Sequence, residues 1–140
     1  MRVLAVDPGE KSLGIALSDP TGTIANPLTV LHHIARPVDA AAIAQLAAEN
    51  QAELIVVGQA LDADNEPNPQ GRRAARLAEA LRLQTDLPIV LWDESGSTQA
   101  VRAAQAAMGT RLRKRRSHLD ELAATYILQT YLDSHAADSP

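Results

Sequence analysis

The 140-residue chain has no cysteine and no phenylalanine, and it contains only one tryptophan and two tyrosines. The lack of cysteine excludes disulfide scaffolds, thiol nucleophiles and zinc sites built on thiolates, and it fits the reducing cytoplasm in which we expect the protein. The shortage of aromatic side chains argues against an aromatic platform for stacking nucleic-acid bases. No apolar run is long enough to span a membrane, and no signal-peptide pattern opens the chain, so we expect no membrane partner.

A general excess of positive charge is also missing, since the net charge is −4 and the sequence pI is about 5.5. This balance excludes a uniformly basic coat protein for nucleic acid. The charge is uneven, however, because five of the six residues of RLRKRR, at 111–116, are basic. Such a run is either a solvated surface or a local site for phosphates. Chain length and an apolar fraction of 46% predict one domain, which we place at 1–134, with 135–140 as a flexible tail.

Short apolar runs bounded by turn residues predict five strands, at 2–6, 13–18, 22–31, 52–58 and 87–92. Asp19-Pro20-Thr21-Gly22 has the preferences of a type I turn, which predicts a hairpin between the second and third strands. Helical periodicity predicts helices after Pro37 and over 72–85, 97–108 and 119–132. In the first of these, Val38 falls on the apolar side and Asp39 on the other. The fold class predicted is α/β: a five-stranded mixed sheet flanked by helices, with strands 1–3 antiparallel and strands 4 and 5 parallel to strand 1.

The stretch AVDPGEKSLGIALSD, at 5–19, permits two interpretations. Gly9 and Gly14 have the spacing of a phosphate-binding GxxxxG loop, but Ile15-Ala16 stand where that motif needs Lys and Ser or Thr. In the alternative, the loop presents the Asp7 carboxylate to a metal ion, and its glycines allow a tight turn and leave room for a substrate backbone. We favour the second interpretation.

Acidic residues in three separate segments could converge with such a site. Asp7 ends the first strand, Asp93 and Glu94 end the fifth, and Asp120 lies in the first turn of the last helix on its apolar side. The carboxyl ends of parallel strands meet at one edge of a sheet, and hard cations such as Mg²⁺ prefer carboxylate oxygens. Each acid also has a structural interpretation: a strand end for Asp7, a loop for Asp93 and Glu94, and a helix cap for Asp120.

The four histidines give weaker signals. His32 and His33 end a peripheral strand and are expected to be solvated. His118 lies close to Asp120 in the sequence, so proton transfer or a phosphate contact is open to it.

Four segments together resemble the YqgF/RuvX family of RNase H-like nucleases: VLAVDPGEKSLGIALSDPTG, ELIVVG, LPIVLWDES and LDELAATYILQTYL. The resemblance covers nearly the whole chain. It implies an RNase H-like fold and hydrolysis of phosphodiester bonds dependent on Mg²⁺ or Mn²⁺, with Asp7, Glu94 and Asp120 as catalytic metal ligands and Asp93 as a weaker candidate. It further implies a role in processing the 5′ end of pre-16S rRNA, with Holliday junction resolution, which would require a homodimer, as the alternative.

The chain departs from the family pattern at three places. Ser12 and Ser95 stand where the family usually has arginine, and Gly58-Gln59-Ala60 replaces Gly-Leu-Pro, while Asp7-Pro8-Gly9 is closer to the RuvC resolvases. These changes leave the acids intact but shift the expected contacts with structured RNA or branched DNA toward other basic residues: Lys11, Arg72, Arg73, Arg111, Arg113, Lys114, Arg115 and Arg116. A non-catalytic RNA-binding module is a further alternative. A kinase-like or actin-like ATP-binding domain is another, although such proteins need two domains of this kind.

Overall fold

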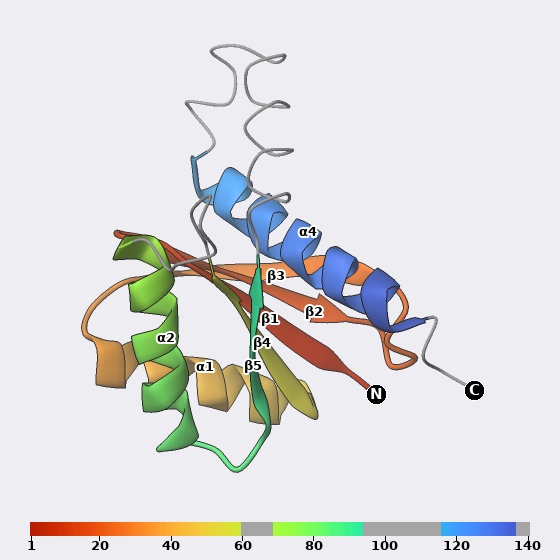
Figure 1. Ribbon diagram of the computed structural model, residues 1–140, viewed down its shortest axis with the longest axis horizontal. Helices are drawn as coiled ribbons and strands as arrows, with labels where there is room; N and C mark the ends of the chain where they lie inside the picture. Colours follow the sequence, from red (N-terminus) through yellow and green to blue (C-terminus); the bar gives the residue numbers. More distant parts are fainter. Residues whose placement is uncertain (60–68, 94–115, 137–140) are drawn as a thin grey trace.

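The computed structural model describes residues 1–59, 69–93 and 116–136, and for residues 69–70, 116–121 and 136 it describes the backbone only. The elements lie in the predicted order along the described chain (Figure 1). Their bounds are β1 Val3–Pro8, β2 Ser12–Ser18, β3 Ala25–His32, α1 Arg36–Glu49, β4 Leu54–Gln59, α2 Pro69–Arg82, β5 Ile89–Asp93 and α4 Arg116–Ala136. The helix predicted over 97–108 lies outside the described residues.

The five strands form one mixed sheet in the order β3-β2-β1-β4-β5. β1 pairs antiparallel with β2, and β2 with β3, whereas β4 is parallel to both β1 and β5. This topology confirms the predicted α/β class. None of the described helices has the length and apolar character needed to cross a membrane.

Alternating side chains of the strands build two cores, one on each side of the sheet. Leu4 and Val6 of β1 face α1 and α2, whereas Val3 and Ala5 face α4. Figure 1 shows the same division, with α1 and α2 on one side and α4 lying across the other. We call these sides the α1/α2 face and the α4 face, and the period of two along each strand assigns every strand residue to one of them.

Three hydrogen bonds fix α4 on its face. The Gln129 side chain accepts a hydrogen bond from the Ala25 N–H at 2.9 Å and donates one to the Thr23 carbonyl at 3.0 Å. Near the opposite edge of the sheet, the Trp92 indole N–H donates to the Thr130 hydroxyl at 3.1 Å. α4 includes His135 and Ala136, the first two residues of the segment expected to be a tail.

The predicted turn between β2 and β3 is present. The Gly22 N–H donates to the Asp19 carbonyl at 3.0 Å, and Gly22 adopts a φ of 72°. The Asp19 carboxylate accepts hydrogen bonds from the backbone of Ile24, from both the hydroxyl and the backbone of Thr21, and from the backbone of Thr23. Of these, the bonds from Ile24, the Thr21 hydroxyl and Thr23 lower the pKa of Asp19 most, to well below its usual range.

The interpretation of α1 needs a correction at its first turn. Val38, predicted on the apolar side, is 47% exposed, whereas Asp39, predicted on the polar side, is only 4% exposed. Asp39 is buried because its carboxylate has partners there: it accepts hydrogen bonds from the Ile34 N–H and from the His33 ring. A buried carboxylate with such partners avoids most of the cost of leaving water.

Candidate functional site

Asp7 lies near the end of β1 and is partly buried. It follows Val3 and Ala5 in the alternation of the strand, which assigns it to the α4 face. The residue opposite it on β2 is Gly14, and the pairing of Val6 with Val57 puts Gly58 of β4 on its other side. Residues at matching positions of neighbouring strands share a face, so Asp7 has a glycine on either side of it. We call Asp7 the glycine-flanked carboxylate, because neither flanking strand position places a side chain beside it.

The opening loop therefore uses its glycines in two different ways. Gly9 makes the turn: its N–H donates to the Ser12 carbonyl at 2.9 Å, and a Cβ at Gly9 would lie 2.4 Å from that oxygen. Gly14 belongs to β2 rather than to the turn, and it is the residue that leaves space next to Asp7. The expected tight turn is thus confirmed for Gly9 but not for Gly14.

Asp120 belongs to α4, the helix that covers the face of Asp7. It lies four residues before Ala124, which is fully buried against the sheet. Figure 1 shows α4 beginning at the end of the sheet where β5 finishes, so its first turns lie at the edge of the sheet that collects the carboxyl ends of the parallel strands. The structure describes the backbone of Asp120 and not its side chain.

Asp93 and Glu94 differ in position. Asp93 is the last residue of β5, is exposed, and pairs with Gln59. Val90 and Trp92 belong to the α4 face and Leu91 to the α1/α2 face, so the alternation assigns Asp93 to the face opposite Asp7. Glu94 lies outside the described residues. Among the described side chains, no group of three or more acids and histidines could hold a metal ion.

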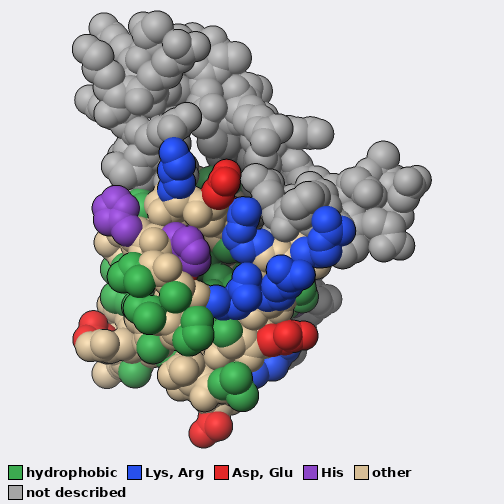
Figure 2. All heavy atoms as spheres, turned by 90° about the vertical axis from the view of Figure 1, so that its left-hand side faces the viewer, with side chains coloured by type: hydrophobic (Ala, Val, Ile, Leu, Met, Phe, Trp, Pro, Cys, Tyr) green, Lys and Arg blue, Asp and Glu red, His purple; other side chains and the backbone are tan. Residues whose placement is uncertain are grey.

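The predicted basic contacts are only partly described. Lys11 is exposed in the loop between β1 and β2, Arg72 is exposed on α2, and Arg73 is partly buried. Figure 2, which views the left-hand side of Figure 1, shows Lys and Arg side chains forming a band beside histidine side chains. Arg116 begins α4, where only its backbone is described. The remaining basic candidates, Arg111, Arg113, Lys114 and Arg115, lie outside the described residues, as does Ser95.

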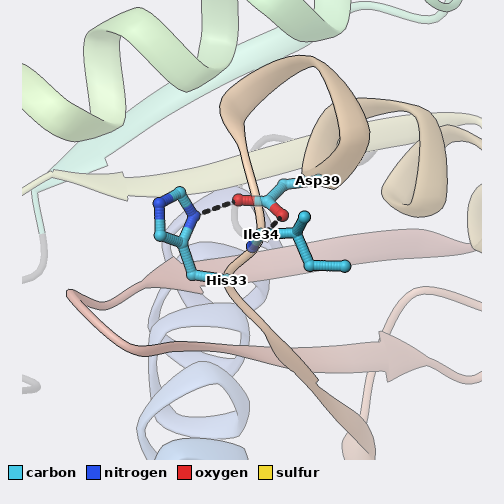
Figure 3. Close-up of polar contacts among 3 residues, drawn as sticks. All are labelled: His33, Ile34 and Asp39. Atoms are coloured by element: carbon cyan, nitrogen blue, oxygen red, sulfur yellow. Dashed lines mark hydrogen bonds and ion pairs between the residues drawn. The ribbon is translucent and has the colours of Figure 1, made fainter.

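A cleft of about 60 Å³ opens on the α1/α2 face, directly after Asp7 in the chain. Pro8 and Gly9 form one wall, His33 comes from the segment that joins β3 to α1, and Arg36 and Asp39 come from the first turn of α1. The His33 Nδ1 lies 2.5 Å from Oδ2 of Asp39, and Oδ1 accepts the Ile34 N–H at 3.1 Å (Figure 3). Sequence reasoning missed this pair because it interpreted His33 as solvated; the spacing of six residues across a helix start was the available signal.

Comparison with known proteins agrees with this architecture. Residues 1–134 match the family model RuvX, described as Holliday junction resolvase. The chain belongs to the RuvX family. A relative from Thermoanaerobacter pseudethanolicus is 37% identical over 135 residues, which cover 96% of this chain and 97% of the relative. One from Clostridium novyi is 35% identical over 134 residues, covering 96% and 99%. Both carry the name "Putative pre-16S rRNA nuclease".

Solved structures that resemble this chain have the RNase H-like fold. RuvC from Thermus thermophilus, in complex with a Holliday junction substrate, has a TM-score of 0.56 at 16% identity, covering 97% of this chain and 96% of RuvC. The Holliday junction resolvase of fowlpox virus, with its substrate junction DNA, has a TM-score of 0.54 at 11% identity, with coverage of 96% and 98%. The predicted RNase H-like fold and the resemblance to the family are both confirmed.

Proposed function

We propose that this RuvX-family protein is a divalent-metal-dependent nuclease that processes the 5′ end of pre-16S rRNA in the cytoplasm. Membership of the family makes it a nuclease, a hydrolase of phosphodiester bonds. The observation that carries the proposal further is the glycine-flanked carboxylate of Asp7 on the face covered by α4. We propose that residues 1–134 act as one nuclease domain.

The donor set fits Mg²⁺ or Mn²⁺. Carboxylate oxygens are the ligands that these hard cations prefer, and the space beside Asp7 would be closed by a Cβ at Gly14 or Gly58. We assign the metal to Asp7, Glu94 and Asp120, because Asp93 belongs to the opposite face of the sheet by its position in β5. When bound, the metal would activate a water molecule and stabilise charge on the scissile phosphate.

The side chains of this chain have simpler tasks in the proposed reaction. Asp7 presents its carboxylate from a paired position in the middle strand of the sheet, so the ligand needs little reorganisation when a metal binds. Lys11 lies in the loop that follows Asp7, and Arg73 lines the cleft beside Pro8 and Gly9. Their charges would hold the nucleic-acid backbone in place of the arginines that the family usually has at positions 12 and 95. The basic segment 111–116 is assigned the same task.

Resolution of branched DNA is the second candidate. The description of the RuvX family as Holliday junction resolvase supports this candidate. The fold of nearly the whole chain also resembles that of two resolvases. Symmetric resolution needs two active sites, so this candidate also requires a homodimer. A non-catalytic RNA-binding module is the third, because Ser12 and Ser95 remove two expected arginines.

One experiment separates the three candidates. The purified protein is given a precursor-rRNA 5′ fragment and a four-way DNA junction side by side, with Mg²⁺ or Mn²⁺, and Asp7→Asn serves as the inactive control. We expect cleavage of the RNA, loss of cleavage in Asp7→Asn, and loss of cleavage in wild type when EDTA removes the metal. Paired nicks in the junction would favour the resolvase instead.

Titration with Mn²⁺ provides the test of the metal site itself. Wild-type protein should bind Mn²⁺, and Asp7→Asn should abolish that binding while its melting temperature stays within the range of wild type. If wild type binds no Mn²⁺ and cleaves neither substrate, the nuclease proposal fails and the binding module remains.

A further inference from the structure

The cleft on the α1/α2 face is large enough for a phosphate group. The volume of the cleft is about 60 Å³. One water molecule needs about 10–15 Å³ on the same measure, so the cleft accommodates roughly four to six heavy atoms. Leu13 and Leu77 form its apolar walls. The polar side chains come from three parts of the chain: the segment before α1, the first turn of α1, and α2.

His33 is held in a fixed orientation at this cleft. Asp39 is buried, and its carboxylate can only accept hydrogen bonds when ionised, so the His33 Nδ1 carries the hydrogen that the two share at 2.5 Å. The backbone is anchored as well, because the His33 N–H donates to the Lys11 carbonyl at 2.9 Å. Nε2 is therefore the ring nitrogen available to a ligand, on a side chain that is 44% exposed.

The charges around the cleft favour an anion. Arg36 and Arg73 line it, and Asp39 is the one acid among the lining residues that the structure describes. The carboxylate of Asp39 is turned to Ile34 and His33 (Figure 3), and the two guanidinium groups outnumber this single acid at the cleft. Guanidinium groups bind phosphate oxygens through paired N–H donors.

A purely structural role explains only part of this arrangement. Asp39 lies in the first turn of α1 and accepts the Ile34 N–H, which serves the helix start because Ala35, the N-cap, makes no side-chain bond. That role needs one carboxylate oxygen. It does not require the second oxygen to hold an imidazole at a cleft lined by two arginines.

We propose that His33, Arg36 and Arg73 form a phosphate-binding subsite, oriented by Asp39, that takes a backbone phosphate of the nucleic acid next to the scissile one. Pro8 and Gly9 of the cleft directly follow Asp7 in the chain. A nucleic-acid strand that crosses this end of the sheet would therefore reach both Asp7 on the α4 face and the cleft on the α1/α2 face. The identity of the ligand as nucleic acid rests on the proposed nuclease function, whereas binding of phosphate does not.

Inorganic phosphate is the first probe. Its binding is measured, in the absence of metal, by NMR of the histidine ring signals. We expect the His33 signals to shift and saturate, and the signals of the neighbouring, exposed His32 to stay nearly unchanged. In the double variant Arg36→Gln/Arg73→Gln, the shift of the His33 signals should no longer saturate with phosphate. Equal, non-saturating shifts of His32 and His33 in wild type would overturn the proposal.

A short single-stranded RNA in EDTA is the second probe. His33→Ala, Arg36→Gln and Arg73→Gln should each weaken binding about tenfold, as expected for a lost charge-assisted hydrogen bond. Each arginine variant should also reduce the slope of log K against log salt concentration by about 1. Matched controls are His32→Ala and Arg76→Gln, since Arg76 is exposed on α2 and does not line the cleft. Equal losses in the controls would reduce the cleft to general surface charge and overturn the proposal.

Cleavage kinetics distinguish this subsite from the nuclease centre. The cleft variants should raise KM with little change in kcat, whereas Asp7→Asn should lose kcat and keep metal-free RNA binding. Asp39→Asn, with its fold checked by circular dichroism, should weaken RNA binding as His33→Ala does, because the orienting charge is lost. If the wild type cleaves but the cleft variants match it, the subsite fails alone; if phosphate binds and nothing is cleaved, the nuclease proposal fails alone.

Discussion

Asp7, Asp19 and Asp39 are the same side chain in three environments, and each environment assigns a different task. Asp39 is buried and bonded to His33 and Ile34. Asp19 is at the surface but accepts bonds from the turn that it begins. Asp7 has glycines at the neighbouring strand positions on its face. Asp19 and Asp39 therefore serve a turn and a helix start, whereas the glycines beside Asp7 mark it as the candidate ligand.

Asp19 should make the stability of the protein depend on pH in the acid range. Its pKa is lowered in the folded state, so its contribution is complete above the unfolded value of about 3.9 and is lost as pH falls below it. Asp19→Asn should lower the melting temperature at neutral pH, and the difference from wild type should shrink on acidification. Thermal melts over pH 2–7 measure this, with the exposed Asp86→Asn as control. A difference that is constant with pH would contradict the assignment.

Ser18 provides a second test at the scale of single residues. Its hydroxyl is buried and accepts the Val3 N–H at 2.8 Å while donating to the Asp19 carbonyl at 3.0 Å. Ser18→Ala leaves the buried Val3 N–H without this partner, which should lower the free energy of unfolding by about 1–3 kcal/mol. Urea denaturation would show the loss, whereas the exposed Ser134→Ala should change stability little.

At the scale of elements, the strands were predictable because short apolar runs buried on both faces have few alternative structures. The register and the order β3-β2-β1-β4-β5 also follow the rules for hairpins and crossovers. The first turn of α1 was not predictable from periodicity. Asp39 is buried because of His33, a residue outside the helix, and helical spacing contains no information about such a partner. The strand predicted at 13–18 already contained Gly14, so only the tight turn expected of both loop glycines was wrong for it.

The stability of the protein should depend strongly on the buried side chains that α4 packs against the sheet. Leu128 is fully buried between α4 and the sheet, so Leu128→Ala should cost about 2–5 kcal/mol of the free energy of unfolding. Leu122→Ala on the same helix is the control, since Leu122 is 39% exposed and should cost much less. Chemical denaturation of both variants compares them, and equal losses would mean that α4 is not seated as described.

At the scale of the molecule, the sheet separates two kinds of chemistry that share one end. The α4 face holds the glycine-flanked carboxylate, and the α1/α2 face holds the cleft with its arginines and His33. The acidic candidates could be proposed from sequence because predicted strand ends and a predicted helix start favour one edge of the sheet. Their ligand geometry could not, since the positions of Glu94 and the Asp120 side chain depend on segments whose contacts the pattern does not define.

Gly58 tests whether the space beside Asp7 matters to the whole reaction. Gly58→Ala adds one methyl group on the face of Asp7, so we expect Mn²⁺ binding and cleavage to fall strongly. The melting temperature should stay at or above that of wild type, because alanine in a strand interior is favoured over glycine by about 0.5–1 kcal/mol. Calorimetry and the cleavage assay together measure this. Full activity in Gly58→Ala would show that the space is not used.

The two glycines beside Asp7 also limit how the protein can be engineered. Replacing strand glycines is an ordinary way to stabilise a domain, but at Gly14 and Gly58 it would exchange activity for stability. Substitutions for thermal tolerance are better made elsewhere, for example at Leu83, which is 86% exposed just beyond α2. A library that is selected on melting temperature alone should therefore accumulate inactive variants at these two positions.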